Sequence, residues 1–295
     1  MYFKRILSAK GIIMAKRFKH IYLEITDICD RHCSFCPEVR REKLFMPADE
    51  AENYLKQIAE LSEAVYFHIQ GEPLLHPDFE RISSFAKKCG LILKLTTNAS
   101  HLKKYSDYLL SGIFYQINFS MQSLNEVSVC ERLRVQQDIA DFTLTALDKC
   151  PDMYINFRWW QDLPPDLDFF CVRFGIERDR WLPVQGRNNT RIIGRLYSSF
   201  DREFVWPSES SARDGGSHGT CKGLIDHCGI LCDGRVVPCC LDAGGELVLG
   251  NLLQDKLLNI LESPQACAMA DGFRHNKCIH KLCRNCNFAR RFDLK

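Results

Sequence analysis

Residues 21–37 read Ile-Tyr-Leu-Glu-Ile-Thr-Asp-Ile-Cys-Asp-Arg-His-Cys-Ser-Phe-Cys-Pro, and they carry more functional information than the rest of the chain. An apolar run typical of a β-strand leads into three closely spaced cysteines, Cys29, Cys33 and Cys36. Cysteine thiolates are the usual ligands of iron–sulfur clusters, so this loop can hold three irons of a 4Fe–4S cluster. No nearby cysteine supplies a fourth ligand. The open iron that remains indicates chemistry rather than simple electron storage.

A zinc knuckle, or a few reduced core thiols, is the alternative interpretation of these three cysteines. Structural zinc sites are normally closed tetrahedra built from two pairs of ligands. A run of three cysteines followed directly by Pro37 fits that pattern poorly. We therefore interpret the run as the ligand loop of an iron–sulfur cluster.

The composition is that of an ordinary globular protein. The 295 residues are 46% hydrophobic and 26% charged, enough for one large domain or for a large and a small one. The net charge of +2 gives no electrostatic argument for nucleic acid. No apolar run approaches the roughly 20 residues of a membrane-spanning helix. We expect a cytoplasmic protein with neither nucleic acid nor membrane as a partner.

The basic segment 1–19 has no small-residue cleavage site, which argues against a signal peptide. We expect it to form a short amphipathic helix, or to be an extension ahead of a start at Met14. Sixteen cysteines without a secretion signal favour metal binding or catalysis over a disulfide scaffold. Five isolated cysteines are expected in the core: Cys89, Cys130, Cys150, Cys171 and Cys267.

Strand-like and helix-like runs alternate up to about residue 185. The expected strands are Ile21–Thr26, Val65–Gln70, Leu91–Thr97, Tyr115–Ser120, Tyr154–Trp159 and Trp181–Val184. The expected helices are Pro47–Ser62, Pro77–Cys89, His101–Ser111, Glu131–Lys149 and, with a weaker pattern, Asp166–Gly175. Such alternation predicts βαβ units and a parallel sheet in an α/β fold. Six strands are too few for a closed eight-stranded barrel.

Polar motifs follow the expected strands. Gly71-Glu72-Pro73 comes directly after the second strand, Asn98 follows the third, Ser120 ends the fourth, and Arg158 lies in the fifth. Parallel α/β folds place their active sites at the carboxyl ends of the strands, where the three-cysteine loop also belongs. Capping and turn roles are the alternative for each of these residues. Residues that can line the substrate side are Tyr66, His68, His76, Tyr115, Asn118, Trp159 and Trp160.

The cysteine spacing, with aromatic Phe35 just before the third cysteine, resembles the radical S-adenosylmethionine (SAM) superfamily. The resemblance implies a partial (β/α)6 barrel in which the open iron chelates the methionine end of SAM. Reductive cleavage of SAM would give a 5′-deoxyadenosyl radical that abstracts hydrogen from a substrate. A Gly-Gly-Glu-Pro loop binds the amino group of SAM in this family, and Gln70 replaces its first glycine here. The resemblance also implies SAM contacts for Asn98, Ser120 and Arg158.

The C-terminal cysteines resemble the start of a SPASM extension, which many radical SAM enzymes carry. Asp233-Gly234 predicts a hairpin turn that leads into Cys239. A full SPASM domain has two further cysteines, whereas the nine residues after Cys286 contain none. The resemblance thus implies a shortened, twitch-type extension, small, cysteine-rich and α+β, with one closed auxiliary 4Fe–4S cluster. Its ligands would be Cys221, Cys239, Cys283 and Cys286.

Alternatives stay open in this region. Cys240 can replace Cys239, since spacing does not separate the two. Cys228, Cys232 and Cys278 are surplus, as core residues or as a second site. A zinc ribbon would use Cys228-x3-Cys232 with Cys283-x2-Cys286, because paired cysteines suit zinc as well as iron.

We expect an N-terminal extension over 1–19, a radical SAM barrel over 20–205 and an auxiliary-cluster domain over 206–295. The predicted function is reductive cleavage of SAM to modify a peptide or protein side chain, or a small metabolite. Flavodoxin or ferredoxin would supply electrons. No residue is assigned as catalytic. The alternatives are a non-catalytic zinc or iron–sulfur regulatory module, and an RNA-modifying enzyme, which the small net charge disfavours.

Overall fold

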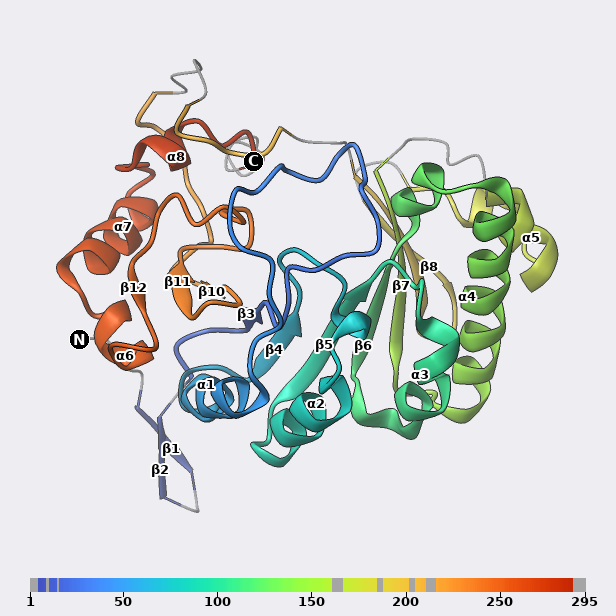
Figure 1. Cartoon of the computed structure of the whole chain (residues 1–295), viewed down its shortest axis with the longest axis horizontal. Helices are drawn as coiled ribbons and strands as arrows, with labels where there is room; N and C mark the ends of the chain where they lie inside the picture. The colour runs from blue at the N-terminus through green and yellow to red at the C-terminus, as the bar shows by residue number, and fades with distance from the viewer. Residues whose placement is uncertain are drawn as a thin grey trace.

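The computed structural model describes residues 5–8, 11–14, 16–160, 167–184, 188–201, 205–210 and 216–288. At its centre is a ten-stranded sheet in the order β12-β11-β10-β3-β4-β5-β6-β7-β9-β8 (Figure 1). Six consecutive strands of the barrel are parallel: β3 (Ile21–Leu23), β4 (Ala64–Phe67), β5 (Ile92–Thr97), β6 (Gln116–Ser120), β7 (Tyr154–Trp159) and β9 (Leu196–Phe200). The sheet stays open, which confirms the predicted α/β partial barrel.

Helices cover one face of this sheet, while short helical turns lie in the loops. The helices are α1 (Ala48–Leu61), α2 (Phe79–Lys88), α3 (Leu102–Tyr108), α4 (Val129–Lys149) and α5 (Leu167–Phe174). The short turns are η1 (Pro73–Leu75), η2 (Leu109–Ile113), η3 (Met121–Glu126) and η4 (Arg178–Arg180).

Alternation along the strands decides which side chains meet the helices. In β7 the buried Phe157 packs against Phe170 of α5, with ring centroids 5.0 Å apart. Its neighbours Asn156 and Arg158 are half-buried and point to the opposite, concave face. The hydrophobic core therefore lies between sheet and helices, and the concave face is left for polar side chains.

The expected sixth strand is wrong. Trp181 does not belong to a strand; it is fully buried and stacks on Phe157 at 5.9 Å between ring centroids. Its apolar neighbourhood reflects core packing rather than sheet pairing. The sixth parallel strand is β9, paired in an antiparallel hairpin with the edge strand β8 (Asn189–Ile193). This hairpin turns at Gly194 (φ 53°).

The N-terminal segment also differs from expectation. It contains a two-stranded antiparallel hairpin, β1 (Arg5–Ser8) and β2 (Gly11–Met14), instead of an amphipathic helix. Figure 1 shows this hairpin projecting below the sheet.

The C-terminal extension continues the barrel sheet beyond β3. Its strands are β10 (Gly229–Ile230), β11 (Arg235–Val237) and β12 (Gly250–Asn251), and β10 pairs in parallel with β3. The predicted hairpin turn is present, with Gly234 at φ 81° between β10 and β11. Three helices complete the extension: α6 (Leu257–Leu261), α7 (Pro264–Arg274) and α8 (Lys281–Arg284). The predicted α+β extension is thereby confirmed.

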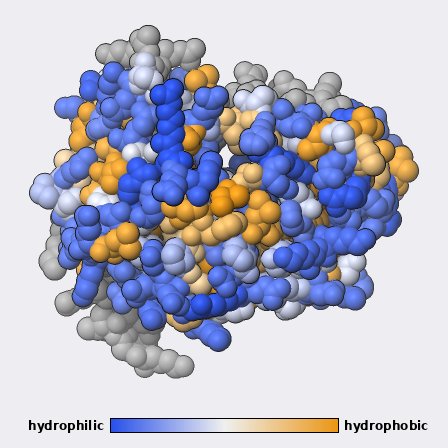
Figure 2. Space-filling view, viewed as in Figure 1, coloured by the Kyte–Doolittle hydropathy of each residue, from blue (hydrophilic) through white to orange (hydrophobic). Residues whose placement is uncertain are grey.

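The surface in Figure 2 is mostly hydrophilic, with apolar side chains gathered across the middle of this face. Within the part of the chain that the structure describes, no helix is both long and apolar enough to cross a membrane.

Candidate functional site

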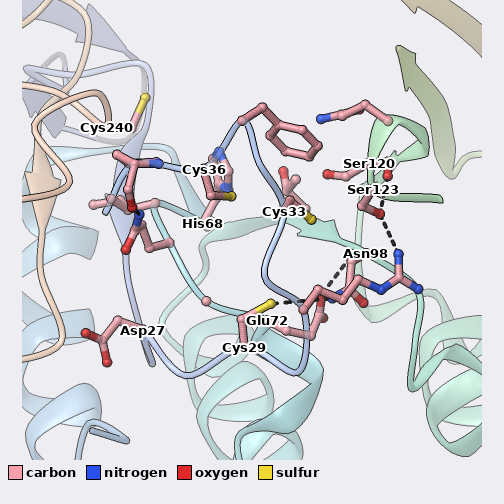
Figure 3. A pocket seen from close by; sticks show the side chains of 18 of the residues that line it. Asp27, Cys29, Cys33, Cys36, His68, Glu72, Asn98, Ser120, Ser123 and Cys240 are labelled. Carbon is pink, nitrogen blue, oxygen red and sulfur yellow. Dashed lines mark hydrogen bonds between the residues drawn. The ribbon is translucent and has the colours of Figure 1, made fainter. Parts of the chain in front are cut away.

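The long loop between β3 and α1 carries the three clustered cysteines, and it extends past the carboxyl ends of the strands (Figure 1). A cavity of about 940 Å³ lies there, and Cys29, Cys33 and Cys36 all line it (Figure 3). Cys33 and Cys36 hydrogen bond to each other, which raises the pKa of Cys33 and lowers that of Cys36. The three thiols thus face one space, with no fourth cysteine ligand from this loop.

Gly71 lets the loop after β4 pack directly on the backbone that leads into Cys29. Its φ is 72°, and a Cβ at this position would lie 2.3 Å from the carbonyl oxygen of Thr26. The next amide, of Glu72, donates to the carbonyl of Ile28 at 2.9 Å. A side chain at residue 71 would push the two loops apart, so glycine is required here.

The buried carboxylate of Glu72 joins the loop after β4 to the end of β5. Its carboxylate accepts hydrogen bonds from Thr97 Oγ1 (2.7 Å) and from the amides of Asn98 (2.6 Å) and Leu74 (3.0 Å). Burial raises the pKa of Glu72 to about 7, although the hydrogen bonds favour the ionised form. The side chain is 1% exposed. The Glu72 carboxylate chiefly stabilises the loop after β4, since most of its hydrogen-bond acceptor sites are occupied.

Asn98, at the end of β5, reaches the cysteine loop. Its Nδ2 atom donates to Asp30 Oδ1 at 3.0 Å and to Cys29 Sγ at 3.6 Å (Figure 3). Burial raises the pKa of the Cys29 thiol to about 11. A buried thiolate is therefore costly until a cation compensates it, and metal binding supplies that compensation. The donor set fits an iron–sulfur cluster.

Ser120 and Phe35 complete the rim of the cavity. Arg31 Nη1 donates to Ser123 Oγ at 2.6 Å, and Ser123 Oγ donates to the carbonyl of Ser120 at 2.6 Å. The ring of Phe35 meets Trp160 edge to face at 4.9 Å. These contacts hold the cysteine loop against β6 and β7.

The structure thus brings nearly all of the predicted barrel residues to one cavity. Its lining includes Cys29, Cys33, Phe35, Cys36, Gly71, Glu72, Asn98, Ser120 and Arg158. Pro73 does not line the cavity; it is buried at the start of η1, beneath the loop. Of the suggested substrate-side residues, Tyr66, His68, Asn118 and Trp160 line the cavity, whereas His76, Tyr115 and Trp159 do not.

Sequence reasoning missed two residues of this cavity that hold the cysteine loop in place. Trp206 donates from Nε1 to the carbonyl of Phe35 at 2.7 Å, although 171 positions separate them. Arg31 is 8% exposed and buttresses Ser123. Its place inside the cysteine motif was the available signal, whereas nothing in the sequence points to Trp206.

The C-terminal cysteines form a second group. Burial raises the pKa of Cys239, and the proximity of Cys221, its chain neighbour Cys240, Cys283 and Cys286 raises it further. A Cβ on Gly223 would lie 3.5 Å from Cys221 Sγ and 3.7 Å from Cys239 Cβ. The four predicted ligands therefore lie in one neighbourhood.

The adjacent Cys240 belongs to a different environment. It lines the barrel cavity and hydrogen bonds with Tyr22 of β3. Geometry therefore separates two thiols that spacing alone does not, and it places Cys239 with the C-terminal group.

The surplus cysteines Cys228, Cys232 and Cys278 are buried in the hydrophobic core. Cys130 and Cys267 are exposed, so their predicted core placement is wrong. Among the described residues, no three or more His, Cys, Asp or Glu side chains are placed to hold a single metal ion. Sulfurs on one zinc lie about 3.8 Å apart, since each Zn–S bond is about 2.3 Å. Cluster ligands are spread more widely because each binds a separate iron.

An open parallel barrel with three thiols at its mouth defines an iron–sulfur protein with a cofactor cavity, and the comparisons agree. A model described as "Radical SAM superfamily" matches residues 23–157, and one described as "Iron-sulfur cluster-binding domain" (SPASM) matches residues 221–287. Residues 23–157 thus form a domain of the radical SAM superfamily, a family of enzymes, and residues 221–287 form a SPASM-type domain. The radical SAM domain implies a SAM-binding 4Fe–4S cluster, and the SPASM-type domain implies an auxiliary cluster.

A curated relative is GTP 3′,8-cyclase of Aquifex aeolicus (strain VF5), 32% identical over 120 residues. The match spans 38% of this chain and 38% of the relative, well under half of either.

Three solved structures illustrate the fold. BtrN in complex with AdoMet and 2-DOIA has a TM-score of 0.54 at 15% identity, covering 93% of this chain and 94% of that one. Streptococcus suis SuiB bound to precursor peptide SuiA gives 0.59 at 16%, covering 92% and 71%. The anSMEcpe complex with AdoMet and the Kp18Cys peptide gives 0.56 at 13%, covering 92% and 90%. At such identities the likeness shows the fold alone.

Proposed function

We propose that this protein cleaves SAM reductively at the barrel mouth and uses the resulting radical to abstract hydrogen from a substrate in the cavity. The observation that carries the proposal is the open set of three thiols facing a cavity of about 940 Å³. Cys29, Cys33 and Cys36 would hold the SAM-binding cluster, which supplies the electron for cleavage when bound.

The surrounding residues would bind and orient SAM. The Glu72 carboxylate already accepts three hydrogen bonds, out of about four that such a group can take. The backbone carbonyls of the loop at Gly71 are thus the main acceptors left for the SAM amino group. Pro73 stiffens that loop from beneath. Asn98, Ser120 and Phe35 would position SAM from the opposite side of the cavity.

The second cluster would be held by Cys221, Cys239, Cys283 and Cys286. Four thiolates would leave it no open iron, which favours electron relay or a structural role over substrate binding. The proposed division is an extension at 1–19, the barrel at 20–205 and the auxiliary domain at 206–295.

The substrate class is proposed from the cavity and from what relatives bind. Solved SuiB and anSMEcpe complexes contain peptides, and that of BtrN contains 2-DOIA. We propose a peptide or protein side chain, or a small metabolite, as substrate. A flavodoxin or ferredoxin would donate electrons, in the cytoplasm.

The test is anaerobic incubation of the reconstituted protein with SAM and dithionite, followed by quantification of 5′-deoxyadenosine and methionine. We expect both products in equal amounts from the wild type. A Cys29/Cys33/Cys36→Ala triple variant should yield none. Replacement of the exposed Cys130 by alanine is the matched control and should leave the yield unchanged. A wild type with its full iron content that leaves SAM intact would refute the proposal.

A further inference from the structure

Arg158 is a charged side chain on the concave face of the barrel. It lies in β7, in register with Ser120 of β6 and Ser199 of β9, and it lines the cavity. Its electrostatic neighbours include Tyr22 of β3 and Tyr66 of β4, although two strands separate β7 from β4 in the sheet. The charge of the guanidinium therefore acts across the cavity as well as on its own strand.

No carboxylate neutralises Arg158 within the described part of the chain. The acidic residues that line the cavity are Asp27, Glu38 and Glu72. Asp27 pairs with Arg41 at 3.5 Å and Lys43 at 3.8 Å, Glu72 is committed to its three donors, and Glu38 is exposed. A half-buried guanidinium without a counter-charge is unfavourable and attracts an anion.

The other groups around Arg158 are neutral. They are Tyr22, Tyr66, His68 and Cys240. Burial lowers the pKa of His68 to about 3, and the charge of Arg158 adds to this effect, so the imidazole stays uncharged. Among the described residues, nothing in this neighbourhood competes with a ligand for the guanidinium.

Arg158 lies on β7, and β4, β5 and β6 separate this strand from β3, which leads into the cysteine loop. The resemblance to other radical SAM proteins implies a SAM contact for this arginine, whereas its neighbours Tyr22, Tyr66 and His68 lie on or directly after β3 and β4, across the cavity.

We propose that Arg158 binds a carboxylate of the substrate and so holds the substrate in the cavity. This assignment rests on the radical SAM function proposed above. A carboxylate matches the two parallel N–H groups of a guanidinium. The other cations that line the cavity, Arg31, Arg40 and Lys43, come from the cysteine loop, whereas Arg158 comes from β7.

The test is protection of Arg158 from phenylglyoxal in the anaerobic holoprotein, quantified by peptide mass spectrometry. The small probes are N-acetylglutamate α-amide and, as its neutral match, N-acetylglutamine α-amide. Capped pentapeptides with a central Glu or Gln form the second pair, and SAM alone is a separate arm. Exposed Arg173, paired with Asp141, is the internal reference.

We expect the carboxylate probes to slow modification of Arg158 by about tenfold, the scale of one charge-assisted pair, while leaving Arg173 unaffected. Protection by the small acid points to a metabolite, and protection by the peptide alone points to a peptide substrate. Failure of every carboxylate to protect, or equal protection by the amides, would overturn the proposal. Protection by SAM alone would overturn it too, by assigning Arg158 to SAM.

A binding measurement separates this proposal from the broader one. Arg158→Gln should retain SAM affinity within about twofold and lose at least about tenfold in affinity for the protecting carboxylate, with Arg158→Lys in between. A loss of SAM affinity in Arg158→Gln would contradict the carboxylate assignment. If the wild type does not cleave SAM yet shows carboxylate protection, the radical function fails while the anion site stands.

Discussion

Gly71 and Gly112 have nearly the same backbone conformation in very different surroundings. Their φ angles are 72° and 77°, but a Cβ at residue 71 meets Thr26 at 2.3 Å, whereas one at residue 112 meets nothing within 4 Å. Gly112→Ala should cost about 1 kcal/mol, for the left-handed backbone alone. Gly71→Ala should cost about 3 kcal/mol or more, because two loops must separate.

Urea unfolding of both variants, together with their iron content after reconstitution, checks this expectation. Gly71→Ala should also lose iron from the three-cysteine loop, since the loop that buttresses Cys29 is displaced. Equal stability and equal iron content in the two variants would show that the close approach at Gly71 has no consequence.

Cys239 and Cys240 offer a second matched pair at the residue scale. Cys239 lies with Cys221, Cys283 and Cys286, while Cys240 faces the barrel cavity beside Tyr22. Cys239→Ser should therefore lose most of the auxiliary iron, about four atoms per chain. Cys240→Ser should retain it. Iron and sulfide analysis of both variants is the measurement. Loss of the auxiliary iron in Cys240→Ser, with retention in Cys239→Ser, would make Cys240 the ligand.

At the scale of elements, Arg41 joins the long cysteine loop to the sheet. Its Nη2 lies 2.6 Å from Glu24 Oε1, and its side chain is almost fully buried. Glu24 in turn accepts from the amides of Cys232 (3.0 Å) and Gln70 (3.1 Å). One ion pair thus connects the loop after the cysteines, the loop after β4 and the turn between β10 and β11.

Arg41→Ala should destabilise the protein by about 3–5 kcal/mol, because it leaves the Glu24 carboxylate buried without its partner. The control is Arg81→Ala, which breaks exposed pairs with Asp49 and Glu52 and should destabilise the protein far less, because water screens both pairs. Chemical denaturation of both variants measures the difference. Similar small losses would mean that water reaches Glu24 and replaces the arginine.

The elements that the sequence predicts well are those with a strong period and clear ends. The first five parallel strands and the helices between them follow from apolar runs and helix-start signals. The sixth strand could not be predicted, because β9 carries polar Ser198 and Ser199 while the more apolar Trp181–Val184 fills the core. Tertiary packing overrode the local pattern there.

The residues of the candidate site also divide into those that the sequence predicts and those that it does not. Motifs at the ends of consecutive parallel strands meet because the topology places those ends at one edge, so Glu72 and Asn98 were predictable. Trp206 and Cys240 also line the cavity although they lie far along the chain, and no local sequence pattern predicts this.

At the scale of the whole molecule, the extension and the barrel share one sheet. Because β10 pairs with β3, the strand that leads to Cys29 also borders the extension. The cysteine loop follows β3 and Cys239 follows β11 of the same sheet, with β10 between these two strands, an arrangement that would suit electron exchange between two clusters.

Metal analysis of anaerobically reconstituted protein, beside the Cys29/Cys33/Cys36→Ala variant, tests the central claim most directly. We predict about eight irons and eight sulfides per chain, falling to about four of each in the variant. That result would establish two 4Fe–4S clusters and assign one of them to the open loop. One or two zinc ions with little iron would contradict the account and leave a zinc-binding protein.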